Sequence, residues 1–340
     1  MRFGLIGGGR WAQVHKDALE TVRAELAGVL VASQASAERI RSEWAVPSFT
    51  DLEAFLATDL DAVIVASPNY LHADHAVAAL RTGRHVLIEK PMALTLSGCD
   101  RILAAAEEAD RVVAVGLEMR FFKLFDHVKQ LIGDGAIGRP LHLRLDLWRR
   151  PYRAGAGGWK SDPAKVGSSI LEEPIHYLDL ARWYLAPFAG EPRSVTAWAT
   201  ERPNAPSARE NLDVMLDFGS AKALVTRSIA AWDHKVRLQL VGESGALEAQ
   251  WRGEMDLDPH PDQSLTLRRG TGADAEVVSI PVAPSGHAFD VPKQTQAFMA
   301  AMKGEATQIA SAADGRASVA LCLAVEEALV EGTTTLALDG

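Results

Sequence analysis

The sequence predicts an α/β protein of two domains, and three observations carry that prediction. First, 340 residues are more than a single hydrophobic core usually serves. Second, short apolar runs alternate with amphipathic stretches up to residue 118, which is typical of βαβ units around a parallel sheet. Third, strand-like segments from residue 194 to residue 241 follow one another without helices, which indicates an open, mostly antiparallel sheet. We therefore expect one domain over residues 1–118 and a second α/β domain over residues 119–340.

The first domain is expected to contain five strands with helices between them. The apolar runs that predict the strands cover residues 2–6, 26–32, 62–66, 85–88 and 112–115. The run at 62–66 is continuously apolar, as expected for a strand covered on both faces. The helices are expected over residues 11–24, 35–43, 51–57, 71–80 and 95–109, with Thr50 and Thr95 as helix caps.

The second domain begins with a predicted helix over residues 123–132 and a strand over 141–148. After a Gly- and Arg-rich loop, a helix is expected from about residue 174 to 185. At least four strands follow, over residues 194–200, 211–218, 222–229 and 236–241. Glycine-containing turns after the second and fourth of these favour antiparallel hairpins. Helices over 290–302 and 316–330 close the chain, and whether the last of them packs back on the first domain is left open.

Composition limits the classes of function. The chain has 48% hydrophobic and 23% charged residues, which is ordinary for a globular protein. Its net charge of -9 and its dispersed Lys and Arg residues argue against a nucleic-acid-binding surface. Cys99 and Cys322 form no CxxC pair, so no disulfide framework is expected. No leader and no apolar run of membrane-spanning length is present, so we expect a cytoplasmic protein without a membrane partner.

A glycine-rich turn follows the first predicted strand and opens the first predicted helix. It has the Gly-x-Gly-x-x-Ala form of a dinucleotide-binding turn. Gly7 allows the tight turn, Gly9 leaves room for a pyrophosphate, and Ala12 lets helix and strand approach closely. The helix N-terminus favours phosphate and carries two further candidate cofactor ligands, Arg10 and Trp11. The first domain is therefore predicted to be a Rossmann domain that binds NAD or NADP, with a plain tight turn as the alternative.

The end of the second strand bears on the choice between these cofactors. An acid that grips the ribose hydroxyls of NAD usually stands there, but this sequence has Ser33 and no acid before Glu38. Ser33 cannot repel a 2′-phosphate, and Arg39 can pair with one. These two cofactor-binding candidates favour NADP slightly over NAD. The alternative for Arg39 is an ordinary exposed charge on a helix.

The fourth apolar run is predicted to end in Glu89-Lys90-Pro91. Ligand crevices in doubly wound sheets lie at the carboxyl ends of the strands. Lys90 is therefore expected to face both cofactor and substrate, where an ammonium can polarise a substrate oxygen, and Glu89 is expected beside the cofactor. The bond before Pro91 can be cis or trans. The alternative is a surface lysine that begins a loop.

The preceding strand breaks abruptly at Ser67-Pro-Asn69, with His72 close behind. This polar loop is expected beside the nicotinamide or its phosphates, which makes Ser67, Asn69 and His72 candidate cofactor ligands. The alternative for Asn69 is a cap on the following helix. His72 and His75 are spaced i, i+3, but no further ligand lies nearby, so we expect no metal there.

The second half holds another cluster of ionisable residues. Glu172, His176 and Asp179 fall at i, i+4 and i+7, on one side of a helix if it includes all three. A His with a carboxylate partner is suited to proton transfer near neutral pH, so His176 and Glu172 are candidate catalytic and substrate-binding residues. The alternative is a structural helix start with a packed His. No matching second ligand set supports a metal at Glu173 and His176.

Two further regions supply candidate substrate contacts. The loop over residues 148–160 carries Tyr152 and Trp159, whose rings can stack on a sugar, together with cations that can receive an anion or hydroxyls. Arg120, just after the last strand of the first domain, is a candidate to reach the same crevice. The alternative for both regions is surface packing.

These motifs, in this order, resemble the Gfo/Idh/MocA oxidoreductases, which include inositol dehydrogenases and glucose–fructose oxidoreductase. The resemblance rests on the Gly7 turn, the Ser67-Pro-Asn69-x-x-His72 loop, Glu89-Lys90-Pro91 and the acid-x-x-x-His176-x-x-Asp179 segment, and it covers essentially the whole chain. It implies a Rossmann domain and an α/β domain whose open sheet forms the substrate wall and often a dimer face. A homo-oligomer, dimer or tetramer, is therefore expected.

The resemblance also implies that Lys90 and His176 are catalytic, assisted by the residue four positions before the His. Family members usually carry Asp there in a Gly-rich stretch, whereas this sequence has Glu172, and Ser168, Ser169 and Pro174 replace some of the glycines. A carboxylate is kept, but its reach and the shape of the substrate pocket differ.

The sequence thus predicts a reversible NAD(P)-dependent oxidoreductase that acts on a secondary alcohol of a sugar, inositol or related polyol. In the oxidation, His176 is expected to accept the hydroxyl proton while Lys90 stabilises the charge that develops on the same oxygen. One rival is a reductase of dihydrodiol, biliverdin or imine type on the same fold. The others are a non-catalytic nucleotide sensor and a metal-dependent lyase or hydrolase at Glu173 and His176.

Overall fold

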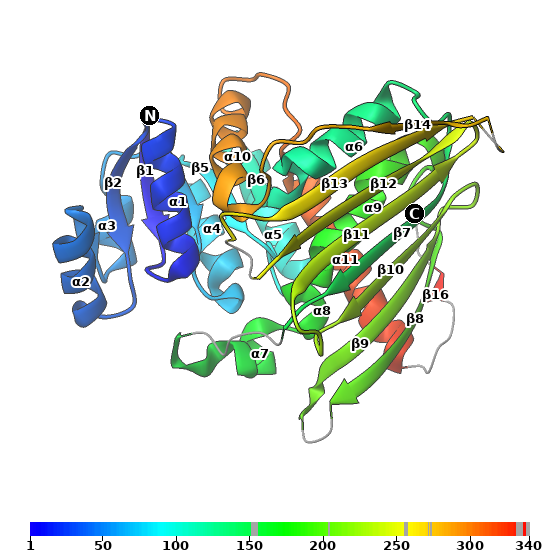
Figure 1. Cartoon of the computed structure of the whole chain (residues 1–340). Coiled ribbons are helices and arrows are strands. Elements are labelled where there is room, and N and C mark those ends of the chain that lie inside the picture. The colour runs from blue at the N-terminus through cyan, green and yellow to red at the C-terminus, as the bar shows by residue number, and fades with distance from the viewer. Residues whose placement is uncertain are drawn as a thin grey trace. The chain divides into compact units, whose positions relative to one another are not determined.

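The structure, a computed structural model, describes residues 1–150, 156–202, 205–254, 258–270, 272, 274–330 and 336–337. The chain divides into two compact units (Figure 1). The first unit comprises Met1–Leu117, Ala154–Gly167 and Val291–Ala320. The second unit comprises Glu118–Arg153, Ser168–Asp290 and Leu321–Gly340. The end of the first long segment falls one residue before the expected boundary, and two later segments join the first unit.

A seven-stranded sheet forms the centre of the first unit, in the order β15-β6-β5-β4-β1-β2-β3. Neighbours from β1 to β6 run parallel, and β15 pairs antiparallel with β6. This order runs outward from β1 in both directions, which confirms the predicted Rossmann fold. The strands are β1 (Arg2–Ile6), β2 (Glu25–Leu30), β3 (Ser48–Phe49), β4 (Ala62–Val65), β5 (His85–Glu89), β6 (Val113–Gly116) and β15 (Ala310–Ser311).

Helices accompany this sheet as the alternating pattern predicted. They are α1 (Arg10–Thr21), α2 (Gln34–Trp44), α3 (Leu52–Leu56), α4 (His72–Arg81), α5 (Leu96–Ala109) and α7 (Pro163–Val166), with short 3-10 turns η1 (Asn69–Leu71) and η3 (Ala156–Ser161). The two last helices of the chain, α10 (His287–Ala301) and α11 (Ala312–Val330), each contribute a part to the first unit.

Apolar side chains from both ends of the chain build the core of the first unit. Every residue of β4 is buried, as its continuous apolar run predicted. Phe298 of α10 is fully buried in the same cluster as Phe3, and the two ring centroids lie 6.3 Å apart. Arg316 of α11 donates to Asp100 of α5 at 2.6 Å. The last helices therefore pack, in part, on the Rossmann sheet.

The second unit is built on a nine-stranded sheet in the order β14-β13-β12-β11-β7-β10-β9-β8-β16. All its pairings are antiparallel except that of β7 with β10. This confirms the expected open, mostly antiparallel sheet. Its strands are β7 (Pro140–Trp148), β8 (Ser194–Arg202), β9 (Ala205–Asp217), β10 (Lys222–Ser228), β11 (His234–Gly242), β12 (Gly245–Gly253), β13 (Asp262–Arg269), β14 (Glu276–Ser279) and β16 (Leu336–Ala337).

One face of this sheet is covered by helices. The helices α6 (Lys123–Gly133) and α9 (Pro174–Ala189) contact strands of the sheet, preceded in the chain by η2 (Glu118–Phe121) and α8 (Ser169–Glu172). Leu143, Leu145 and Leu147 of β7 are buried, whereas Trp148 in the same strand is 52% exposed. The alternation is typical of an antiparallel sheet with one face on the core and one open face (Figure 1).

Three local predictions need correction or extension. The cap of α3 is Asp51, whose side chain accepts from the Ala54 N–H at 2.8 Å, and not Thr50; Thr95 does cap α5. Four strands beyond those predicted, β12 to β14 and β16, extend the second sheet, and β3 and β15 extend the first. The helix expected from about residue 174 begins at Pro174, and Glu173, with φ −143° and ψ −42°, separates it from α8, so no single helix includes both Glu172 and His176.

Candidate active site

The carboxyl edge of the first sheet begins with the glycine turn after β1. Gly7 has φ +128°, and a Cβ there would lie 2.4 Å from the carbonyl oxygen of Ala66, so only glycine fits. Gly9 is the N-cap of α1, and a Cβ on it would meet nothing within 4 Å. Open space at Gly9 in front of a helix N-terminus fits a dinucleotide pyrophosphate. Arg10 is exposed and Trp11 half-buried at the start of this helix.

Ser33 and Arg39 flank this turn from α2. The Ser33 hydroxyl caps α2 by accepting from the N–H of Ser36 at 3.2 Å. The Arg39 guanidinium donates to the carbonyl of Gly8 at 2.7 Å and to Glu43 at 2.9 Å. The structure thus brings Arg39 to the glycine turn, although the two are far apart in the sequence.

The polar loop after β4 is largely occupied with internal bonds. Asn69 is buried and its amide donates to the carbonyl of Val166, the last residue of α7, at 3.1 Å. It does not cap the following helix, which corrects that alternative. Ser67 bonds through its hydroxyl to Nδ1 of His75 at 2.9 Å.

His72 joins two loops at the carboxyl edge. Its ring nitrogens lie 2.7 Å from the carbonyl oxygens of Pro91 and Ser67. Burial lowers the pKa of His72, and the two carbonyls offset part of that effect. Because both nitrogens already contact the protein, His72 holds the loops together and is not placed as a direct cofactor ligand, contrary to our expectation.

Lys90 follows the last residue of β5 and is half-buried. The bond between Lys90 and Pro91 is cis. Glu89, the last residue of β5 at this carboxyl edge, is buried and its Oε1 lies 2.7 Å from Nε2 of His15 in α1. Burial alone would raise the pKa of Glu89, but the hydrogen bond and charge of His15, with Lys90, bring it below its ordinary value.

In the second unit, His176 lies in the first turn of α9 and is 4% exposed. Glu172 is buried at the end of α8, on the far side of the break at Glu173. No single helix includes both residues, so the condition for a shared helix face is not met. A carboxylate that faces the His176 ring is that of Glu118 in η2, with Oε1 3.6 Å from Nε2. The same oxygen lies 3.2 Å from Nδ1 of His287.

Arg120 is also buried in the second unit. Its Nε and Nη2 donate to the two carboxylate oxygens of Asp179 at 2.8 and 2.6 Å. Its guanidinium also lies over the ring of Trp183, 5.6 Å from the centroid. Arg120 therefore fixes η2 to α9, which differs from the expected substrate contact.

Of the two aromatic candidates in the long loop, Tyr152 lies outside the described residues. Trp159 is half-buried in η3, which belongs to the first unit, and Lys160 lies over its ring at 5.5 Å. Among the described residues there is no group of three His, Cys, Asp or Glu side chains that could hold a metal ion.

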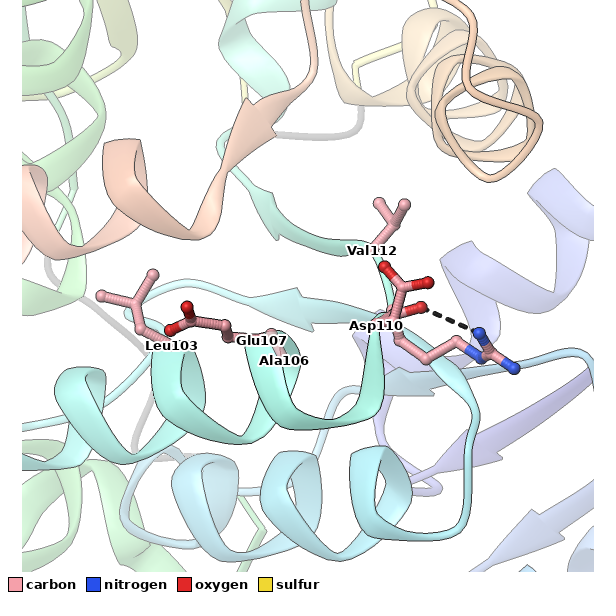
Figure 2. A pocket seen from close by; sticks show the side chains of 6 residues that line it. Leu103, Ala106, Glu107, Asp110 and Val112 are labelled. Atoms are coloured by element: carbon pink, nitrogen blue, oxygen red, sulfur yellow. Dashed lines mark hydrogen bonds between the residues drawn. The ribbon is translucent and has the colours of Figure 1, made fainter.

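An open hollow of about 500 Å³ lies beside the C-terminal end of α5 (Figure 2). Val112, one of its lining residues, directly precedes β6, so the hollow lies at the amino ends of the parallel strands. The glycine turn and Lys90 stand at the carboxyl ends, where dinucleotides bind. The hollow is lined by Leu103, Ala106, Glu107, Asp110, Arg111 and Val112, and we assign it no part in the site.

The sequence did not identify His15, Glu118 or His287. Glu118 stands in the Glu-Met-Arg-Phe segment that brought Arg120 to attention, and its position just after a Rossmann strand was an available signal. His15 and His287 had no such signal, because each meets its carboxylate through a long-range contact.

A Rossmann unit with a glycine turn open to a pyrophosphate, joined in one chain to an α/β unit with an open antiparallel sheet, defines a class of two-domain nicotinamide-dependent oxidoreductase. Residues 1–117 match the family model described as "Oxidoreductase family, NAD-binding Rossmann fold", and residues 125–248 match the "GFO/IDH/MocA C-terminal domain". Together they cover more than two thirds of the chain. The chain belongs to the Gfo/Idh/MocA family of oxidoreductases, and its cofactor is NAD or NADP.

Named relatives share the family. Inositol 2-dehydrogenase of Rhizobium meliloti is 28% identical over 97% of both chains. Glucose-6-phosphate 3-dehydrogenase of Bacillus subtilis is 31% identical, but the match spans 54% of this chain and about half, 53%, of that enzyme. The solved structure of levoglucosan dehydrogenase in complex with NADH and levoglucosan is 21% identical, covers 100% of both chains and has a TM-score of 0.85, which shows the shared fold. No helix in the described part of the chain is long and apolar enough to cross a membrane.

Proposed function

We propose that this protein transfers a hydride reversibly between a nicotinamide cofactor and a secondary alcohol or ketone of a sugar, inositol or related polyol. The observation that carries the proposal is Lys90, which follows β5 at the carboxyl edge of an NAD-binding sheet and beside a loop tied by His72. Named relatives act on an inositol and on a sugar phosphate, as their names state. The hydroxyl groups of such substrates can form hydrogen bonds with ionisable side chains of both units.

Lys90 and His176 would share the proton chemistry. The bound cofactor supplies the hydride acceptor or donor. In the oxidation, the Lys90 ammonium donates a hydrogen bond to the alcohol oxygen and stabilises its developing negative charge. His176 takes the hydroxyl proton, and in the reverse direction it returns that proton to the oxygen.

Glu172 would anchor a neighbouring hydroxyl of the substrate. The break at Glu173 separates it from the helix of His176, so the alternative role of orienting His176 is less well supported. We keep Trp159 as a candidate for stacking on the sugar ring. For Arg120, the buried pair with Asp179 supports a role in holding the His176 helix.

For the cofactor we propose a preference for NADP. Ser33 offers no negative charge at the end of β2, and Arg39 lies 2.7 Å from the carbonyl of Gly8 in the glycine turn. A guanidinium there can pair with a 2′-phosphate. Fluorescence titrations with NADPH and NADH test the preference, and tighter binding of NADH would overturn it. Arg39→Ala should weaken NADPH binding at least tenfold and leave NADH binding almost unchanged.

The activity itself is tested by absorbance of the reduced nicotinamide across sugars, inositols, uronates, a dihydrodiol and an imine, with both cofactors. Lys90→Ala and His176→Ala should each lower kcat by at least about a hundredfold while cofactor binding stays close to wild type. Lys222→Ala, an exposed lysine on β10, serves as the matched control. Full activity in either active-site variant, or turnover of the imine alone, would contradict the proposal.

We also propose a cytoplasmic homo-oligomer. The open face of the second unit's sheet carries large apolar side chains, among them Trp198 at 42% and Val277 at 54% exposed. Exposed apolar area of this kind favours a contact with a second copy. Light scattering of the purified protein gives its mass directly, and a monomer at micromolar concentration would contradict this part.

A further inference from the structure

We propose that Glu118 is a positioning residue that sets the proton affinity of His176, with His287 competing for the same carboxylate oxygen. The inference rests on the proposed function, because His176 is the proton acceptor there. It adds two residues that neither the motifs nor the spacing of the sequence identified.

The contact geometry is the first support. Oε1 of Glu118 lies 3.6 Å from Nε2 of His176 and 3.2 Å from Nδ1 of His287. The side chains of Glu118, His176 and His287 are only 5, 5 and 9% exposed. A carboxylate removed from water is costly unless a positive charge compensates it. Two imidazoles within 4 Å of one oxygen can supply that charge by binding a proton.

The surrounding fold holds the three groups in place. Glu118 lies in η2, whose Arg120 is bound at two points to Asp179 in the helix of His176. His287 begins α10, and its ring meets the edge of Phe122 at 4.8 Å between centroids and 88°. Asp290 in the first turn of α10 accepts hydrogen bonds from Ser285, Gly286 and the backbone of Lys123. The distances from Glu118 to both rings are therefore fixed from two directions.

The other charges around His176 are mainly committed to ion pairs. Arg120 binds Asp179, and Arg149 binds Glu173 at 2.5 Å. Lys123 lies 3.8 Å from Asp290. Glu172 at the end of α8 is a further buried acid, and Lys129 contacts Trp183 in the same helix as His176. The carboxylate of Glu118 lies within 4 Å of the ring of His176.

The chemical consequence follows from charge. When His176 takes the alcohol proton, the O–H bond breaks, an N–H bond forms and the C–O bond becomes a carbonyl, while the oxidised nicotinamide cofactor would accept the hydride that leaves carbon. The ring is then an imidazolium beside a carboxylate, which stabilises it. In the reduction the same pair keeps His176 protonated and ready to donate. His287 shares the oxygen and, when charged, weakens this effect.

The kinetic test is the isosteric substitution Glu118→Gln. Loss of an opposite charge at this distance shifts the pKa of a partner by roughly one to three units. The acid limb of the oxidation and the alkaline limb of the reduction should therefore both move to lower pH by about that amount. A disturbance of packing alone would lower activity without moving both limbs in one direction. Glu118→Asp keeps the negative charge, so both limbs should stay close to their wild-type positions.

A second measurement does not depend on turnover. The ring of His176 is titrated by NMR in protein labelled with ¹⁵N-histidine, with His176→Asn to assign the signal. Its midpoint should fall in Glu118→Gln, fall less in Glu118→Asp, and not fall in His287→Gln, which leaves the carboxylate in place. Where Glu118→Gln does not fold, His287→Gln carries the test, because removal of the competing imidazole should raise the His176 midpoint.

The two outcomes are distinguishable. An unchanged His176 midpoint in Glu118→Gln, or in His287→Gln where that variant replaces it, overturns the inference even if the enzyme oxidises sugars. A shifted midpoint with full activity in His176→Asn overturns the proposed function and leaves the electrostatic coupling standing.

Discussion

At the residue scale, much of the buried polar chemistry of this protein lies in pairs that cross the sequence. His15 meets Glu89 across 74 positions, and Arg120 meets Asp179 across 59. Burying one charge alone is costly, so each of these groups is held by its partner. The consequence is a set of fixed side chains directly beside Lys90 in the first unit and His176 in the second.

Lys129 offers a prediction at this scale. It contacts the carbonyl of Trp183 and lies over its ring at 5.0 Å. Burial, followed by the charge of Arg120, lowers the pKa of Lys129 to about 8. The folded state therefore loses this proton near pH 8, whereas the unfolded chain keeps it to about pH 10.5. Since the unfolded state binds more protons in that window, the free energy of unfolding should rise with pH there.

Lys129→Met removes the titrating group and should remove this rise. Urea unfolding of both proteins from pH 7.5 to 10.5 measures it, with the difference between wild type and variant growing in favour of wild type. A difference that stays constant over this range would show that Lys129 keeps its proton in the folded state.

At the element scale, Thr50 and Thr95 both precede a predicted helix in the sequence, but of the two only Thr95 caps its helix. Thr95 accepts from the N–H of Gly98 at 3.1 Å and caps α5, whereas Asp51, not Thr50, caps α3. Loss of an N-cap costs about 1 kcal/mol. Thr95→Ala and Asp51→Ala should each lower the free energy of unfolding by about that amount, and Thr50→Ala by much less. Chemical denaturation of the three variants checks this, and equal losses for both threonines would refute the assignment.

Sequence patterns predicted some strands of this protein and missed others. Five strands of the first sheet were predicted because short, continuously apolar runs such as β4 are typical of strands covered on both faces, whereas the two-residue strands β3 and β15 were not predicted. Strands β12 to β14 were missed because residues such as Ala246, Glu248 and Gln250 have weak β-propensity, and only pairing with β11 and β13 places them. Lys90 and His176 were found because each stands in a dense local motif.

Whether one helix includes both Glu172 and His176 could not be predicted from spacing. An i, i+4 pattern assumes one continuous helix, and Glu173 leaves that conformation. Glu118 and His287 were not identified as site residues for a related reason, because no local pattern links residues on η2 and α10. Local periodicity therefore predicted the elements and the motif residues, whereas the partners of those residues required tertiary structure.

At the scale of the whole molecule, two sheets provide two separate hydrophobic cores, and the expected cofactor ligands all belong to the first unit. A ligand that binds only the folded state stabilises it by about 2.7 kcal/mol at a concentration a hundred times its Kd. NADPH should therefore slow hydrogen exchange most in the segments around β1 and β4 and less in β11 and β12 of the second unit.

Gly9 and Gly133 form a matched pair to test where that stabilisation originates. A Cβ at either position meets nothing within 4 Å, and neither glycine has a positive φ, so both alanine variants should fold. Gly9→Ala fills the space before α1 through which the pyrophosphate passes, and should abolish the protection by NADPH. Gly133→Ala, at the end of α6 in the second unit, should retain it. Protection that survives in Gly9→Ala would mean that the dinucleotide does not cross the glycine turn.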